Sequence, residues 1–121
     1  MCTVKKMRIG NRTFKVADIK QTYMKNIVDA AANCDFIERI VLFGSCIEER
    51  CQESSDIDLA IFGTKVPSRA LQSKKYERFA RQLYLFDNNS QAYDLLYFKT
   101  GVEKKSRIME DIEKGEIVYE R

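Results

Sequence analysis

Histidine and tryptophan are absent from this chain of 121 residues, and proline occurs only once. Without histidine, neither a Ser-His-Asp nor a Cys-His mechanism is available. Any catalysis must therefore depend on carboxylates and on a metal ion that they bind. One proline and five glycines leave no stretch with the composition of an interdomain linker. We therefore expect a single domain, residues 1–121, built around one hydrophobic core.

Long apolar runs are also lacking. The chain has no stretch of about 18 consecutive apolar residues, and its first six residues lack the apolar segment of a signal peptide. These absences predict a cytoplasmic protein that does not bind a membrane. The net charge is +3, from 21 basic and 18 acidic residues, and gives no support for a dedicated nucleic-acid interface.

The four cysteines, at positions 2, 34, 46 and 51, show no C-x-x-C spacing and have no histidine beside them. A zinc site is therefore not expected. Cys46 and Cys51 flank the segment after Gly44 that is discussed below. The sequence leaves two interpretations of them open, as redox-sensitive thiols or as small half-buried residues.

Hydrophobic periodicity predicts an α/β fold, α+β in stricter terms, with a small mixed sheet and helices packed against it. Residues 1–16 form an N-terminal hairpin, with strands between Met7 and Val16 and a type II′ turn at Gly10-Asn11. The chain from 39 to 120 is the core that carries the motifs. Further strands are expected over 39–43, 56–62, 92–98 and 116–119. Helices are expected over 18–32, briefly from Ser45, and over 67–86 and 102–114.

The predicted helix over 67–86 carries several lysines and arginines, which are ordinary on a solvent-exposed face. Its apolar residues recur every three or four positions, which predicts a stripe that packs into the core. The residues of this stripe are Tyr76, Phe79, Leu83 and Phe86.

Asp56 and Asp58 enter the apolar run Ala60-Ile61-Phe62. In a β-strand, side chains two residues apart point to the same face. The two carboxylates should therefore project together while Ile57 and Leu59 point into the core. Mg²⁺ prefers such oxygen ligands and is usually bound by one or two carboxylates together with substrate phosphates. The alternative is a charged strand edge that discourages aggregation.

A strand, a tight turn and a short helix are predicted just before these carboxylates. Gly44 ends the apolar strand 39–43, and Ser45 and Glu48 have the spacing of a capping box. Glycine lets the backbone approach a phosphate closely, and free N–H groups at a helix start favour anions. Alone, a Gly-Ser between a strand and a helix is weak evidence of a phosphate site and more often marks a simple turn.

Together, Phe43-Gly44-Ser45, ten intervening residues and Asp56-Ile57-Asp58-Leu59 resemble the signature of the DNA polymerase beta-like nucleotidyltransferase superfamily, in particular its minimal nucleotidyltransferases. The end of the chain, from Ile108 to Glu120, is similar to that family's closing helix, glycine and short strand. The resemblance implies a polymerase beta-like nucleotidyltransferase fold. The family commonly carries a small residue, an arginine and a glycine just after the Gly-Ser, whereas this chain has residues 46–51 there, without the glycine. Glu48 and Glu49 would weaken the binding of a triphosphate unless Arg50 turns inward and the acids face water.

The resemblance also implies a third carboxylate, and Asp94 is the only acid in its predicted strand. An ionised carboxylate in an apolar strand is costly unless it is paired or bound to a cation. Alternatively, Asp94 only begins the strand after the polar loop 88–91. By resemblance, two Mg²⁺ ions would be held by Asp56, Asp58 and Asp94, and the nucleotide, with ATP as the expected donor, by Gly44, Ser45 and Ser55.

The expected reaction is transfer of a nucleoside monophosphate, AMP from ATP, to a hydroxyl group. By resemblance alone, the acceptor is a partner HEPN-domain toxin, with this chain as its antitoxin. Two alternatives remain open: a catalytically degenerate protein that acts as a binding partner, and transfer to a small molecule. The sequence does not decide the oligomeric state, and an oligomer is compatible with it.

Overall fold

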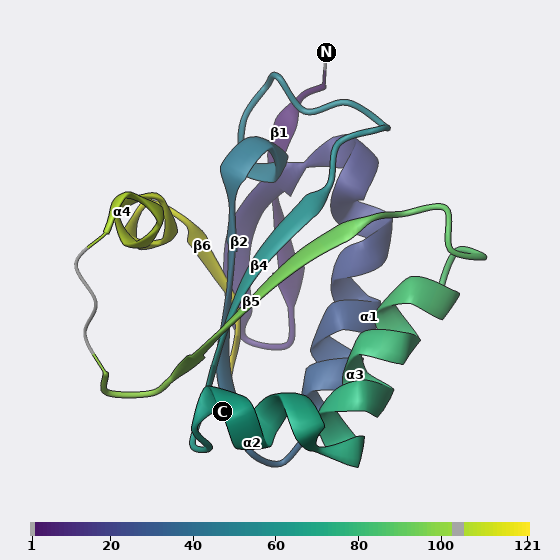
Figure 1. Cartoon of the computed structure of the whole chain (residues 1–121). Helices are drawn as coiled ribbons and strands as arrows, with labels where there is room; N and C mark the ends of the chain where they lie inside the picture. Colours follow the sequence, from purple (N-terminus) through teal and green to yellow (C-terminus); the bar gives the residue numbers. More distant parts are fainter. Residues whose placement is uncertain (1, 103–105) are drawn as a thin grey trace.

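The computed structural model describes residues 2–102 and 106–121 (Figure 1). In these residues a four-stranded mixed sheet has the order β5-β4-β3-β6. β3 pairs antiparallel with β4 and β6, whereas β4 and β5 are parallel. The strands are β1 (Val4–Ile9), β2 (Arg12–Ala17), β3 (Ile37–Phe43), β4 (Ile57–Gly63), β5 (Tyr93–Lys99) and β6 (Glu116–Glu120). The helices are α1 (Gln21–Ala32), α2 (Pro67–Gln72), α3 (Lys74–Leu85) and α4 (Arg107–Glu113). The predicted α+β class with a small mixed sheet is confirmed.

The sheet has two differently covered faces because side chains alternate along each strand. Ile57, Leu59 and Ile61 of β4 pack into the larger core beside α1 and α3. Ala60 and Phe62 point the other way and pack with Ile112 of α4 in a smaller cluster. α1 and α3 lie on one side of the sheet in Figure 1, and α4 lies on the other. Among the described residues, α4 is therefore the one helix that covers the second face.

The predicted N-terminal hairpin is present as β1 and β2, although β1 begins at Val4 rather than at Met7. Of the two turn residues, only Gly10 has a positive φ, of 61°, which agrees with a type II′ turn. The hairpin is joined to β6: the Lys15 amide donates to Glu116 Oε1 at 2.7 Å, and Arg12 pairs with Glu120 at 3.0 Å.

The prediction of a single helix over 67–86 is wrong, because two helices, α2 and α3, occupy this range. The chain leaves helical geometry at Ser73, with φ −74° and ψ 136°, and the Ser73 side chain caps α3 by accepting from the Lys75 amide. A serine side chain can satisfy a free N–H at a helix start, so a polar residue within a helical pattern can instead divide it. Of the predicted stripe, Tyr76, Phe79 and Leu83 are buried, but Phe86 lies after α3 and is exposed.

Two other helix boundaries differ from the sequence-based expectation. The segment Asp18–Lys20 is a 3-10 turn before α1, and Asp18 Oδ1 accepts from the Thr3 and Ile19 amides. The last helix starts at Arg107, capped by Ser106, while 103–105 of its predicted range lie outside the described residues. Gly115 follows α4. A glycine is needed at this position because a Cβ would collide with the Leu42 carbonyl oxygen and the Val41 side chain.

Within 2–102 and 106–121, no helix is both long enough and apolar enough to cross a membrane.

Candidate functional site

Two of the three predicted carboxylates are direct neighbours in the sheet. In the parallel pairing of β4 with β5, Asp58 lies opposite Asp94 and Ile57 lies opposite Tyr93. Adjacent strands are roughly 4.8 Å apart, and paired residues point to the same face. Asp58 shares its face with Ala60 and Phe62, so this carboxylate pair, Asp58 and Asp94, lies on the sparsely covered α4 side.

The third predicted carboxylate lies outside the strand. β4 begins at Ile57, so Asp56 is an exposed residue just before it, and the predicted strand 56–62 starts one residue too early. Asp56 is still close enough for its charge to act on Asp58. In the described parts of the chain, no group of three or more Asp, Glu, Cys or His side chains is arranged as a ready metal cluster.

The charges of the site act most strongly on Asp58. Burial raises the pKa of this carboxyl above its ordinary value, and the charges of Asp94 and then Asp56 raise it further, while Arg50 opposes them. Asp94 is exposed, so the desolvation argument made for it from the sequence is wrong. Unneutralised negative charge is therefore concentrated at Asp58, where a cation would be stabilised.

Gly44 lies against this carboxylate pair. Phe43, at the end of β3, pairs with Asp58, and the next residue turns away with a φ of 77°. A Cβ at Gly44 would collide with Asp58 Oδ2. Glycine is thus needed twice at this position, for its backbone conformation and for the space that the carboxylate occupies.

The helix predicted from Ser45 is only a 3-10 turn, Gly44–Ile47. Its first residue has no side-chain cap, and the predicted capping box between Ser45 and Glu48 does not form. Instead, the Ser45 carbonyl accepts from the Glu48 amide at 2.9 Å, and the Glu48 carboxylate pairs with Arg50 at 3.0 Å. A turn this short has no extended helix dipole, so only its local N–H groups and the Ser45 hydroxyl could contact a phosphate.

A family model described as "Polymerase beta, Nucleotidyltransferase" matches residues 25–121, which is most of the chain. The chain belongs to the polymerase beta nucleotidyltransferase family. Family membership supports a general role in nucleotidyl transfer and a nucleoside triphosphate as substrate. No curated protein matches this chain.

Within this nucleotidyltransferase-family domain, a buried lysine that the sequence analysis missed holds the segment before Asp56 in place. Lys20 is 1% exposed, and its ammonium group donates to the carbonyl oxygens of Glu53 and Ser55 and to Gln91 Oε1 at 2.9, 2.8 and 2.6 Å. Gln91 in turn donates to the Ser55 carbonyl oxygen at 3.0 Å. Lys20 thus ties the segment before Asp56 to the start of β5. A lysine within a predicted helix gives no sequence signal of such a role.

Ser55, predicted to contact the nucleotide, also takes part in a local hydrogen bond. Ser55 Oγ accepts from the Gln52 amide at 2.9 Å, which closes the turn before Asp56. The structure therefore gives this side chain a role in shaping the loop.

The cysteines near the site are free thiols. Burial, followed by the neighbouring Cys51, raises the pKa of Cys46 to about 12, so this thiol stays protonated at neutral pH. Its Sγ donates to the Asp56 carbonyl oxygen at 3.2 Å. These observations favour the interpretation of Cys46 as a small packed residue over that of a reactive one.

Replacing Gly44 with alanine should cost stability in two ways. The positive φ alone costs an alanine about 1 kcal/mol or slightly more, and the added Cβ must also displace the Asp58 carboxylate. We expect a lower melting temperature together with weaker binding of a nucleoside triphosphate.

Gly10→Ala is the matched control for this change. Gly10 has a φ of 61°, and a Cβ there would meet nothing within 4 Å. This variant should show the conformational cost without the loss of binding. Equal melting temperatures and equal ATP binding in both variants would show that the close approach of Gly44 to Asp58 does not matter for stability or binding.

Proposed function

We propose that this protein transfers AMP from ATP to a hydroxyl group in an Mg²⁺-dependent reaction, with the carboxylate pair at its centre. The observation that carries this proposal is the direct pairing of Asp58 with Asp94 beside Gly44. Both carboxylates lie on the sparsely covered face, and the pKa of Asp58 is raised. Two carboxylates side by side in this way can supply the oxygen ligands that a hard cation prefers.

Asp56, Asp58 and Asp94 would hold two Mg²⁺ ions in this proposal. When bound, these ions would neutralise charge on the triphosphate and on the attacking and leaving oxygens. Gly44 leaves room for the Asp58 carboxylate, so that the backbone of the turn and this carboxylate can face one phosphate group together. The Ser45 hydroxyl and the amides of the 3-10 turn would donate hydrogen bonds to the β- and γ-phosphates, and Ser55 would shape the edge of the nucleotide site.

The covalent step has a simple balance. The acceptor hydroxyl oxygen bonds to the α-phosphorus, and the bond from that phosphorus to the bridging oxygen breaks, so that pyrophosphate leaves. Asp94, which is exposed, would accept the hydroxyl proton and pass it to water.

The motif's departure from the family at 46–51 affects anion binding less than the sequence alone indicates. Glu48 would repel a triphosphate, but Arg50 forms a close ion pair with it and lowers the pKa of the Glu48 carboxyl. This pairing reduces the repulsion, and it also engages the arginine that could otherwise have contacted phosphate.

For the acceptor, we propose a hydroxyl group on a partner HEPN-domain toxin, with this chain as its antitoxin. The support is the resemblance of its motifs to minimal nucleotidyltransferases. The second candidate is a partner that neutralises the toxin by contact alone. The Glu48 carboxylate, which would compete with a phosphate for Arg50, favours that second candidate.

Pyrophosphate release from ATP and Mg²⁺, with and without the protein encoded by the neighbouring reading frame, tests this proposal. Release that requires both the neighbour and Asp58 is expected, with AMP recovered on the neighbour by mass spectrometry. Complex formation without release would support the binding-only candidate. Release without AMP on the neighbour would point to another acceptor.

A further inference from the structure

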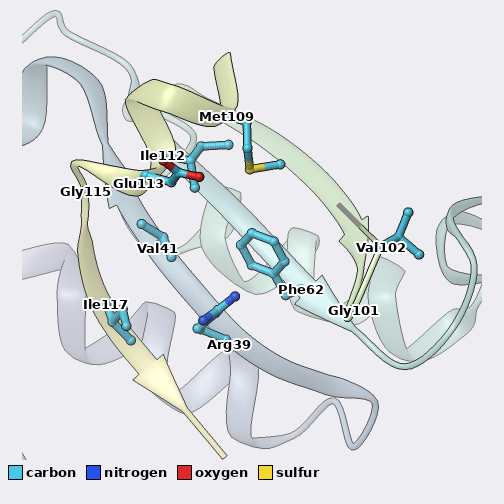
Figure 2. A pocket seen from close by; sticks show the side chains of 10 residues that line it. All are labelled: Arg39, Val41, Phe62, Gly101, Val102, Met109, Ile112, Glu113, Gly115 and Ile117. Atoms are coloured by element: carbon cyan, nitrogen blue, oxygen red, sulfur yellow. The ribbon is translucent and has the colours of Figure 1, made fainter. Parts of the chain in front are cut away.

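A cleft of about 480 Å³ opens on the same face of the sheet as the carboxylate pair (Figure 2). It lies between α4, the residues after β5, and the surfaces of β3, β4 and β6. The residues that line this α4 cleft include Arg39, Val41, Phe62, Val102, Ile112 and Glu113. Its volume falls within the roughly 300–1,000 Å³ of ligand sites in proteins.

The α4 cleft is a continuation of the surface that carries the carboxylate pair. Along β3, Phe43 pairs with Asp58, Val41 with Ala60, and Arg39 with Phe62. Val41, Arg39 and Phe62 line the cleft. Along β4, the cleft therefore begins about two residues after Asp58 and ends about four residues after it. At about 3.3 Å per residue, the far end lies roughly 13 Å from Asp58 along the strand.

Arg39 gives the far end of the cleft a flat cationic surface. Its guanidinium lies over the Phe62 ring, 4.6 Å from the ring centroid, and Phe62 stacks on Phe98 at 5.4 Å. Figure 2 shows Arg39 beside Phe62, across the cleft from Met109 and Ile112. Among the described residues, Arg39 forms no ion pair, and its strand neighbour Glu120 is already paired with Arg12. A planar guanidinium without an anionic partner is suited to stacking on a nucleic-acid base.

Glu113 adds an acceptor closer to the carboxylate pair. It lines the cleft at the end of α4, next to Gly115, which contacts β3 at Leu42 and Val41. A carboxylate accepts hydrogen bonds only, so it fits a group with hydroxyl donors. Along this face of the sheet, the carboxylate pair is thus followed first by the hydrogen-bond acceptor Glu113 and then by the stacking cation Arg39.

We propose that the α4 cleft binds the nucleoside part of the donor nucleotide, with its base on Arg39 and its ribose hydroxyls at Glu113. The proposal rests on the proposed function, because it places the triphosphate at the carboxylate pair. A nucleotide so bound would run from Asp58 along the strand direction toward Phe62. The small volume, the flat cation and the acceptor match one nucleoside better than a protein segment.

Calorimetric titration in Mg²⁺ with three ligands tests this assignment: ATP, 2′,3′-dideoxy-ATP and inorganic tripolyphosphate. Arg39→Met should weaken ATP binding roughly tenfold, which corresponds to the loss of one stacking contact. It should leave tripolyphosphate binding unchanged. Glu113→Gln should remove most of the preference for ATP over the dideoxy nucleotide.

Arg69→Met and Glu110→Gln serve as matched controls, because both residues are exposed and lie outside the cleft. Neither should change any of the three affinities. The melting temperature of each variant reports on its folding, and tripolyphosphate binding confirms that the phosphate site of a variant is intact.

The outcomes separate this inference from the proposed function. Wild-type protein that binds neither tripolyphosphate nor ATP would contradict the proposed function itself. Wild-type protein that binds ATP no better than tripolyphosphate, or an Arg39→Met variant with full ATP affinity, would overturn only the base site. If Arg39→Met keeps its ATP affinity but no longer forms a complex with the protein of the neighbouring reading frame, the cleft would be assigned to that acceptor protein instead.

Discussion

Asp58→Asn is expected to reduce nucleotidyl transfer by roughly 10²–10³-fold or more while raising the melting temperature. The loss of activity follows from the proposed cation site, because an amide does not neutralise a cation. The gain in stability follows from the structure, because Asp58 is partly buried and faces Asp94 directly. Relief of a like-charge pair across two strands is worth about 0.5 kcal/mol. Pyrophosphate release and thermal unfolding measure the two effects on one sample.

The stability gain should depend on pH. The folded state raises the pKa of Asp58, so protonation of this group favours the folded protein, and that contribution is lost as the pH rises through the folded-state pKa. Asp58→Asn should therefore be more stable than the wild type near pH 7, with the difference shrinking toward pH 4. Urea unfolding of both proteins across this range measures the difference.

Asp111→Asn is the control for both measurements, because Asp111 is an exposed carboxylate on α4. It should change neither activity nor stability. Excess EDTA should abolish the activity of the wild type and restore none to Asp58→Asn. Full activity in Asp58→Asn would refute the assignment of the carboxylate pair, and a lower melting temperature would refute the repulsion at Asp58.

Lys20→Met is expected to destabilise the fold by about 2–4 kcal/mol, because hydrogen bonds from a charged group contribute about 1.5–3 kcal/mol each. The variant leaves the Glu53 carbonyl oxygen and Gln91 Oε1 without the donor that they have in the wild type. For a chain of this size, the melting temperature should fall by on the order of 10 °C. Because Lys20 anchors the segment before Asp56, ATP binding should weaken even well below the transition.

Lys25→Met provides the comparison on α1. Lys25 is exposed and pairs with Asp29 at 3.1 Å in an i, i+4 ion pair. Such surface pairs contribute about 0.5 kcal/mol or less, so this variant should melt close to the wild type. Equal melting temperatures for Lys20→Met and Lys25→Met would show that the buried network around Lys20 is not a major support of the site.

Sequence analysis identified both residues of the carboxylate pair, but neither their direct pairing nor the local structure that supports them. An apolar run after Asp58 and another after Asp94 each predict a strand, and the type of strand pairing then places the two acids together. The break at Ser73 and the single turn at Gly44–Ile47 were missed for a common reason. Hydrophobic spacing reports which residues face the core, but a helix boundary depends on individual backbone hydrogen bonds and caps.

The sequence by itself determined the chemistry available to this protein: no histidine, two spaced aspartates, a third before a later apolar run, and a glycine after a strand. These features depend on residue type and on the two-residue period of a strand, both of which are local. Only the tertiary structure decided that Asp58 faces Asp94, that Lys20 is buried beneath the Asp56 loop, and that Arg39 lines a cleft on the same face. These relations join residues distant in the chain, and their energies arise from burial and from partners that exist only once the sheet has formed.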